Sequence, residues 1–308
     1  MSSVLFDVPG PRAVARNRII GAVTILVVLA VLGWVVWRLY ATGQFSAEKW
    51  NIFTYSAVWV RFGEGLLSTL SAFAVAGVGS LVLGFILGIG RLSEHVWVRE
   101  PVRWIIEIMR AIPVLILMML LYYGLPVIGI RMPPYYAVVI ALIVYNGSVL
   151  AEVLRAGIES LPRGQKEAGY AIGLRKTGVM YFILIPQAVR AMMPVIIAQL
   201  VVALKDTALG FIITYQELLY VINQIGNQAP YGSPLIPAAI VGGSMYVAVC
   251  LVLSYIAYRL QRRAKRSAKA GPDEADPRQH DGETNTSLIV AQRGLGKFDA
   301  NNSGASGL

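Results

Sequence analysis

The sequence is poor in the residues that build disulfides, metal centres and water-exposed surfaces. Its one cysteine, Cys250, excludes an intramolecular disulfide, and its two histidines, His95 and His280, do not stand in a metal-binding spacing. Charged residues make up only 14% of the 308 residues, whereas hydrophobic residues make up 56%. A soluble domain cannot bury so much apolar surface, so lipid must form part of the protein's environment.

Motifs for chemistry are also missing. The sequence contains no G-x-x-x-x-G-K-[ST] phosphate-binding loop, no paired cysteine ligands and no recognisable nucleophile motif. We therefore expect that this chain is not an enzyme and binds no cofactor or metal itself. The net charge of +10 is compatible with nucleic-acid binding, but the basic residues cluster beside long apolar runs. That placement favours membrane orientation and argues against a nucleic-acid partner.

Long apolar runs are the main positive feature of the chain. A bilayer core of roughly 30 Å requires about 20 apolar helical residues to cross it. The runs that meet this requirement are 19–40, 66–90, 102–123, 134–153, 182–204 and 235–258. The first is longer than an ordinary secretory signal core, and no small-residue cleavage site follows it, so we interpret it as a retained helix. The predicted fold class is all-α integral membrane, with about six transmembrane helices.

The distribution of Lys and Arg predicts the orientation of these helices, because short cytoplasmic loops carry an excess of both. On one side of the runs the basic residues crowd into 12–18, 91–103, 155–176 and 259–269. The other side holds few: Arg38, Lys49, Arg61, Arg131 and Lys205. We therefore expect both termini, and the segment between the fourth and fifth runs, to lie in the cytoplasm.

These patterns divide the chain into four parts. They are a cytoplasmic N-terminus at 1–18, the first transmembrane helix with an external loop at 19–65, a transmembrane core at 66–263, and a cytoplasmic tail at 264–308. The tail is rich in Pro, Asp, Glu, Asn, Ser and Gly. It is predicted to be disordered, because it cannot bury enough apolar surface to offset the entropy lost on ordering.

Small residues recur every four positions in the second run, at Ser80, Gly84 and Gly88. Such spacing places them on one face of a helix and lets another helix approach closely. We interpret this stripe as a packing surface.

The segment between the fourth and fifth runs is too polar to cross a membrane but is strongly patterned. Pro162 can begin a helix and Gly173 can end one. Between them, Ala168, Ala171 and Ile172 form a narrow apolar stripe at helical spacing. A lone helix this short is marginal in water, so we expect it to dock into a groove of a partner.

A series of residues in and after this helix is specific enough to suggest a family: Glu167, Ala168, Gly169, Gly173, Ile183, Ile185 and Pro186. The series resembles the Glu-Ala-Ala loop in permease subunits of ATP-binding-cassette importers. Gly169 stands in place of the second alanine and Ile185 in place of a leucine. The flanking residues 161–165, 186–190 and 204–207 look like the polar amino acid branch, which serves histidine, glutamine, glutamate and arginine, and most like actinobacterial glutamate permeases.

The resemblance covers about 66–263 and implies a multi-pass subunit of a bacterial plasma membrane. Its implied partners are two nucleotide-binding ATPase subunits that hold ATP and Mg, a second permease subunit, related or identical, and an external substrate-binding protein. The cytoplasmic helix would be the coupling helix that transmits ATP-driven movement. The residues implied for ATPase coupling are Arg163, Gly164, Glu167, Ala168, Gly169, Ala171 and Gly173. The main alternative is a secondary transporter driven by an ion gradient, although the sequence shows no clear internal repeat.

Polar residues inside the runs are candidates for the substrate path, because charges in a membrane usually face a partner or a watery cavity. They are Glu107, Arg110, Asn146, Gln199, Lys205 and Asp206. The first two are three residues apart and could either pair with each other or line the path. The two amides could bind an amino acid or bridge neighbouring helices. The last two could gate the path or anchor a helix end at the membrane surface.

Overall fold

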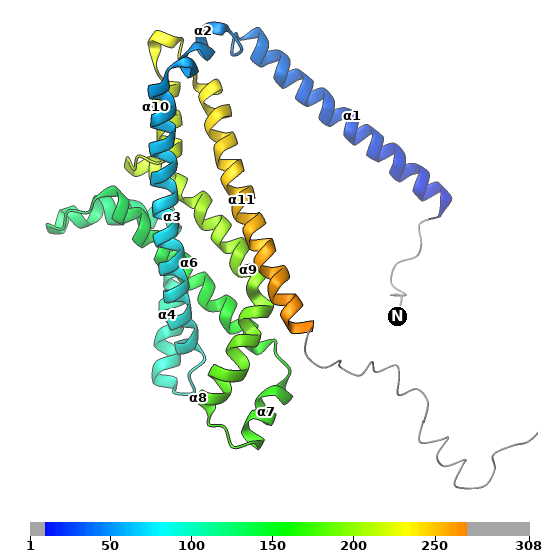
Figure 1. Ribbon diagram of the computed structural model, residues 1–308, viewed down its shortest axis with the longest axis vertical. Coiled ribbons are helices and arrows are strands. Elements are labelled where there is room, and N and C mark those ends of the chain that lie inside the picture. Colours follow the sequence, from blue (N-terminus) through cyan, green and yellow to red (C-terminus); the bar gives the residue numbers. More distant parts are fainter. Residues whose placement is uncertain (1–9, 270–308) are drawn as a thin grey trace, which may run out of the picture. The chain divides into compact units, whose positions relative to one another are not determined.

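The computed structural model describes residues 10–269, and within this range the chain is helical without any β-strand (Figure 1). The predicted N-terminal segment up to residue 9 and the predicted tail from residue 270 lie outside the described residues. The chain divides into two compact units after Ala257. The second unit begins with the end of α11, a helix that continues to Lys269 and therefore beyond the predicted start of the tail at 264.

Among the described residues, five helical segments are long and apolar enough to cross a membrane. They are α1 (Pro11–Ala41), α3 (Ser56–Arg91), α6 (Pro134–Glu159), the continuous segment Lys176–Ile213, and α11 (Leu235–Lys269). The segment Lys176–Ile213 contains α8 (Lys176–Gly178), the π-helix η4 (Val179–Leu184), α9 (Ile185–Asp206) and the 3-10 helix η5 (Thr207–Ile213). These spans correspond to five of the six predicted runs.

The sixth crossing differs from the prediction of one straight run over 102–123. The chain there forms α4 (Val96–Ala111) and α5 (Val114–Met119). The helical segment Val114–Ile128, which begins with α5, is bent by 92° relative to α4. Ile112 is extended, with φ −87° and ψ 120°, because the ring of the following Pro113 disfavours the helical conformation before it. The count of six crossings therefore holds when the bent pair is taken as one span.

Short helices connect the spans. After α1 come α2 (Ala47–Trp50) and the 3-10 helix η1 (Asn51–Thr54), and after α5 come the π-helix η2 (Leu120–Gly124) and the 3-10 helix η3 (Leu125–Ile128). Then follow α7 (Arg163–Ala171), α10 (Leu218–Gly226) and the 3-10 helix η6 (Ala229–Tyr231). The helix α7 is the predicted short helix between the fourth and fifth spans.

The small-residue stripe of α3 packs directly against α6, as its spacing predicts. Ser80 Oγ donates a hydrogen bond to the carbonyl of Leu142 at 3.2 Å. A Cβ atom on Gly84 would lie 2.7 Å from Leu150 Cβ, which is too close for any real side chain, and Gly88 meets the following turn of α6 in the same way. Because residue numbers rise together along both helices, α3 and α6 run parallel. The bent pair α4–α5 therefore returns the chain to the opposite end before α6 begins.

Gly84→Val should weaken this packing. The added atoms would push against Leu150 and against the carbonyl oxygen of Gly147, which would lie 3.0 Å from the new Cβ atom. Overpacking of this kind costs about 1–3 kcal/mol, so the melting temperature of the detergent-purified chain should fall. Gly33→Val is the matched control, because a Cβ on Gly33 in α1 meets nothing within 4 Å. Equal losses in the two variants would contradict the packing role.

Candidate coupling loop and polar cavity

The helix α7 is fixed to the rest of the chain by one face. Gly169 is buried, and a Cβ on it would lie 2.8 Å from Val179 Cγ2 and 2.9 Å from Ile183 Cδ1, both in η4. Just past the helix end, Gly173 has φ +82°, a left-handed conformation that glycine adopts without strain. Pro162 occupies the N-cap position. The predicted helix start and end are both confirmed, and Gly169 serves internal packing.

The opposite face of α7 points away from the chain's own packing. Successive helical residues are about 100° apart, so Gly164, Glu167 and Ala171 lie roughly opposite Gly169. All three are exposed, as is the neighbouring Ala168. Within residues 10–269, Glu167 has no ion pair and no side-chain hydrogen bond. The structure thus gathers part of the predicted coupling set on one open face that carries an unpaired carboxylate.

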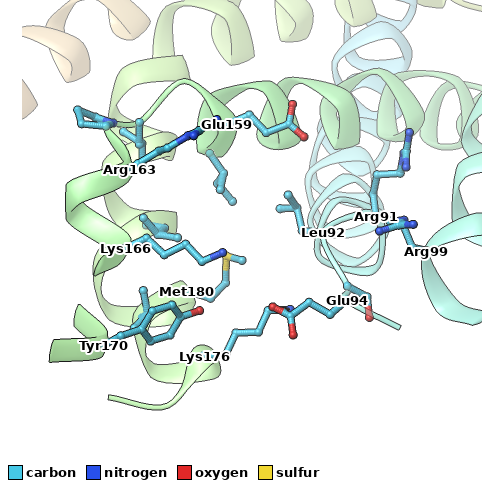
Figure 2. Close-up of a pocket in the computed structure, with 16 residues that line it drawn as sticks. Arg91, Leu92, Glu94, Arg99, Glu159, Arg163, Lys166, Tyr170, Lys176 and Met180 are labelled. Carbon is cyan, nitrogen blue, oxygen red and sulfur yellow. Dashed lines mark ion pairs between the residues drawn. The ribbon is translucent and has the colours of Figure 1, made fainter. Parts of the chain in front are cut away.

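Other members of the coupling set lie elsewhere. Arg163 lines a cavity beside α7, together with Lys166 and Tyr170 (Figure 2). Lys176 lines the same cavity, and its Nζ forms an ion pair with Glu94 at 2.7 Å. The hydrogen bond from Lys176 lowers the pKa of the Glu94 carboxyl below its ordinary value. This ion pair links the start of the fifth span to the loop between α3 and α4.

A second polar cavity, of about 840 Å³, lies between α4 and α6. Its charged and polar lining residues are Glu107, Arg110, Tyr145, Glu152 and Arg155. Two of the predicted path residues therefore share one cavity. This placement agrees with the expectation that charges within membrane helices face water or a partner.

The ion pairs in this cavity differ from the one considered from the sequence. Glu107 Oε1 pairs with Arg103 Nε at 2.9 Å, so the pair between Glu107 and Arg110 is not formed. Arg103 lies four residues before Glu107, a spacing that suits an ion pair on a helix surface. Glu152 is likewise held by Arg155 at 2.9 Å. Arg110 consequently has no carboxylate partner in the described part of the chain.

The two amides bridge neighbouring helices. Gln199 Nε2 of α9 donates a hydrogen bond to Asn146 Oδ1 of α6 at 2.8 Å. Asn146 is only 1% exposed, and its own Nδ2 donates to the Leu142 carbonyl at 3.0 Å. Of the two interpretations of these amides, the observed hydrogen bond between α6 and α9 matches helix bridging.

Lys205 and Asp206 lie apart from the polar cavity. Lys205 lines a different and mostly apolar cavity of about 540 Å³. Residues of α10 line it too, as do Tyr246 and Cys250 of α11. Asp206 ends α9 and is half-buried. The contact of Gly157 with Met192 and the hydrogen bond between Asn146 and Gln199 together show that α9 runs antiparallel to α6. Lys205 and Asp206 therefore lie at the end of the fifth span remote from α7.

A buried carboxyl group, Glu217, was not among the residues predicted from the sequence. Its side chain is 0% exposed and accepts hydrogen bonds from Leu219 N and Tyr220 N, both at 2.8 Å, and from Tyr246 Oη at 2.7 Å. It therefore caps the N-terminus of α10 and ties that helix to α11. An acidic residue immediately before an apolar helical run is the signal that could have revealed it.

Glu217→Ala should destabilise the fold more than Tyr246→Phe. The first change leaves two backbone N–H groups and one hydroxyl without their acceptor, and each buried group left unpaired costs about 1–3 kcal/mol. The second change removes one hydrogen bond and leaves the cap in place. Thermal unfolding of both purified variants measures the difference, and a larger loss for Tyr246→Phe would contradict the capping role.

The fold and the loop together define a class: a multi-pass membrane subunit with a short polar helix held between two spans and no ATP-binding motif of its own. Residues 80–266 match the family described as binding-protein-dependent transport system inner membrane component, and the chain belongs to this family. It is thus a multi-pass inner-membrane permease, and the family leaves ATP hydrolysis to a partner. Members work with ATPases and a periplasmic binding protein. Family membership rules out the secondary transporter considered from the sequence.

Individual relatives agree with this assignment. The chain is 40% identical to the glutamate transport system permease protein GluD of Corynebacterium glutamicum, over 76% of this chain and 84% of the relative. It is 31% identical to the glutamine transport system permease protein GlnP of Escherichia coli, over 69% of this chain and 98% of the relative. A crystal structure of an amino acid ABC transporter with histidines superposes with a TM-score of 0.62 at 26% identity, covering 69% of this chain and 97% of that one. The resemblance to the polar amino acid branch is confirmed.

Proposed function

We propose that this chain forms the membrane path for a polar amino acid, with glutamate as the first candidate, and couples its import to ATP hydrolysis by a partner. The name of the C. glutamicum relative supports glutamate, and 40% identity over most of both chains makes it the first substrate to test. The observation that carries the coupling role is the open face of α7 with its unpaired Glu167.

The proposed path begins with the cavity between α4 and α6. Arg110 has a guanidinium group without a carboxylate partner among residues 10–269, and this group suits the planar carboxylate that every amino acid carries. Glu107 lines the same cavity and is placed by Arg103. We assign the Asn146–Gln199 bridge to hold the two path helices in register. Lys205 and Asp206, at the other end of the fifth span, are proposed as the outer gate.

The proposed coupling mechanism uses the attachment of α7 to the fifth span. Two nucleotide-binding ATPase subunits, which bind ATP and Mg, would grip the face formed by Gly164, Glu167 and Ala171. Because Gly169 packs on Val179 and Ile183, a movement of α7 is passed to the start of that span. The substrate path would then open alternately to the outside and to the cytoplasm. A second permease subunit, related or identical, completes the path, and an external binding protein delivers the substrate.

The proposed orientation places α7 and both termini in the cytoplasm. Parallel α3 and α6 bring Arg91 and Glu159 to the same end as α7, and this end carries most of the Lys and Arg residues of the described loops. Six crossings, with the bent pair taken as one, return the chain to its starting side.

The test is purification of the tagged chain in a gentle detergent, followed by mass spectrometry of the proteins that copurify. We expect a cytoplasmic ATPase and one or two permease copies. Reconstituted with these partners and a binding protein, the chain should import glutamate only with ATP present. Uptake by the chain alone without ATP would overturn the proposal.

A further inference from the structure

A cavity of about 370 Å³ lies between α7, the loop after α3 and the end of α6 (Figure 2). Figure 2 shows Arg163, Lys166 and Tyr170 on one side of it, Arg91 and Arg99 on the other, and Lys176 beside Glu94. The lining therefore holds five basic side chains and only two acidic ones, Glu94 and Glu159.

Most of these charges are balanced inside the chain. Three of the basic residues form ion pairs, Arg91 with Glu152 at 3.6 Å, Arg99 with Glu100 at 3.2 Å and Lys176 with Glu94 at 2.7 Å. Glu159 is held by Arg155. Arg163 and Lys166 have no carboxylate partner within the described range, and Lys166 Nζ lies 5.9 Å from the centre of the Tyr170 ring. The cavity thus retains an excess of positive charge on the α7 side.

Most of the remaining lining is apolar. Leu92 contributes from the loop after α3, Leu161 from the turn before α7, and Met180 and Leu184 from η4. A cavity with a basic wall, an apolar floor and a position at the ends of two membrane spans matches a ligand that has an anionic head next to apolar atoms. Arg and Lys side chains favour phosphate groups among such heads.

We propose that this cavity binds a phosphate group, supplied by an anionic lipid headgroup or by free phosphate, through Arg163 and Lys166. Bound there, the phosphate would draw α7 toward the loop between α3 and α4. The site is separate from the outward face that carries Glu167, so it is expected to bind its ligand in the absence of any ATPase subunit.

Native mass spectrometry of the full-length chain in a neutral detergent tests the proposal. The probes are dioleoylphosphatidylglycerol, dioleoylphosphatidylcholine and inorganic phosphate. We expect tighter binding of the anionic lipid than of the zwitterionic one. One basic residue near an anionic group contributes about 1 kcal/mol, or roughly fivefold in affinity, so the double variant Arg163→Glu with Lys166→Glu should lose well over fivefold.

The matched control carries the same charge change outside the cavity, as Arg175→Glu with Arg190→Glu, two exposed residues that do not line it. Displacement of the anionic lipid by millimolar phosphate would identify free phosphate as the ligand source, and failure of phosphate to compete would identify the headgroup. The proposal would be wrong if the control double variant lost as much affinity for the anionic lipid as the Arg163→Glu, Lys166→Glu variant. It would also be wrong if the chain bound the two lipids equally and did not bind phosphate. Size-exclusion profiles check that all variants remain folded.

Discussion

Glu167→Lys should reduce ATP-driven uptake by the assembled importer by more than about tenfold, since reversing a charge inside an interface costs several kcal/mol. Glu167 lies on the face of α7 opposite the buried Gly169, and no residue of the described chain neutralises it. The change therefore leaves the internal packing of α7 untouched and alters only what a partner meets. Stimulation of the partner's ATPase activity by substrate and binding protein should fall in parallel with uptake.

The control for this prediction is Thr177→Lys, which adds an exposed positive charge on α8, beyond the end of α7. It should retain both activities. Glu167→Gln removes the charge but keeps the shape, so it should fall between the parent and the lysine variant. Normal uptake by Glu167→Lys in a correctly inserted complex would show that the assigned coupling role is wrong.

Arg110→Glu should abolish uptake while leaving the complex intact. The change places a further acidic group, itself unpaired, near Glu107 and Glu152 in the cavity between α4 and α6, where it would repel a substrate carboxylate. A like charge at close range costs several kcal/mol, so uptake should fall more than about tenfold. Arg110→Lys should recover part of it, because the charge is restored without the planar pair of donors.

Arg38→Glu provides the matched control, because it makes the same charge change near the end of α1, outside the residues that match the family. The measurement is initial uptake of labelled glutamate into proteoliposomes, with ATPase activity followed in the same preparation. Wild-type uptake by Arg110→Glu would remove this residue from the path. Loss of copurifying ATPase would instead indicate that the variant fails to assemble.

Much of the architecture could be predicted from periodic features of the sequence. Five of six spans, the start of α7 at Pro162 and its end before Gly173 follow from apolar length and from the backbone limits of proline and glycine. The stripe of small residues in α3 correctly indicated close packing, because spacing fixes which residues share a helical face. These predictions depend on neighbours within a few turns of one helix.

The features that the sequence left open or did not reveal depend on contacts between distant segments or on a choice between nearby partners. A spacing of three residues allowed a pair between Glu107 and Arg110, but Arg103 on the preceding turn is the partner that forms. Glu217 also accepts a hydrogen bond from Tyr246, which lies on another helix, and the residues around Glu217 in the sequence do not indicate this partner. Similarly, Gly169 could be assigned to a docking face from its motif, whereas its burial against Val179 depends on how the loop folds back. Periodicity alone contains no such information.

The 92° bend between α4 and α5 has a consequence for hydration. At the break, the last carbonyl groups of α4 and the first N–H groups of α5 lose their partners within a helix. Hydrocarbon cannot satisfy these groups, so a break at membrane depth is tolerated only where protein or water covers it. Ala111, the last residue of α4, lines the polar cavity. Water in this cavity can thus solvate the broken backbone, and the same water would also solvate a charged solute passing beside it.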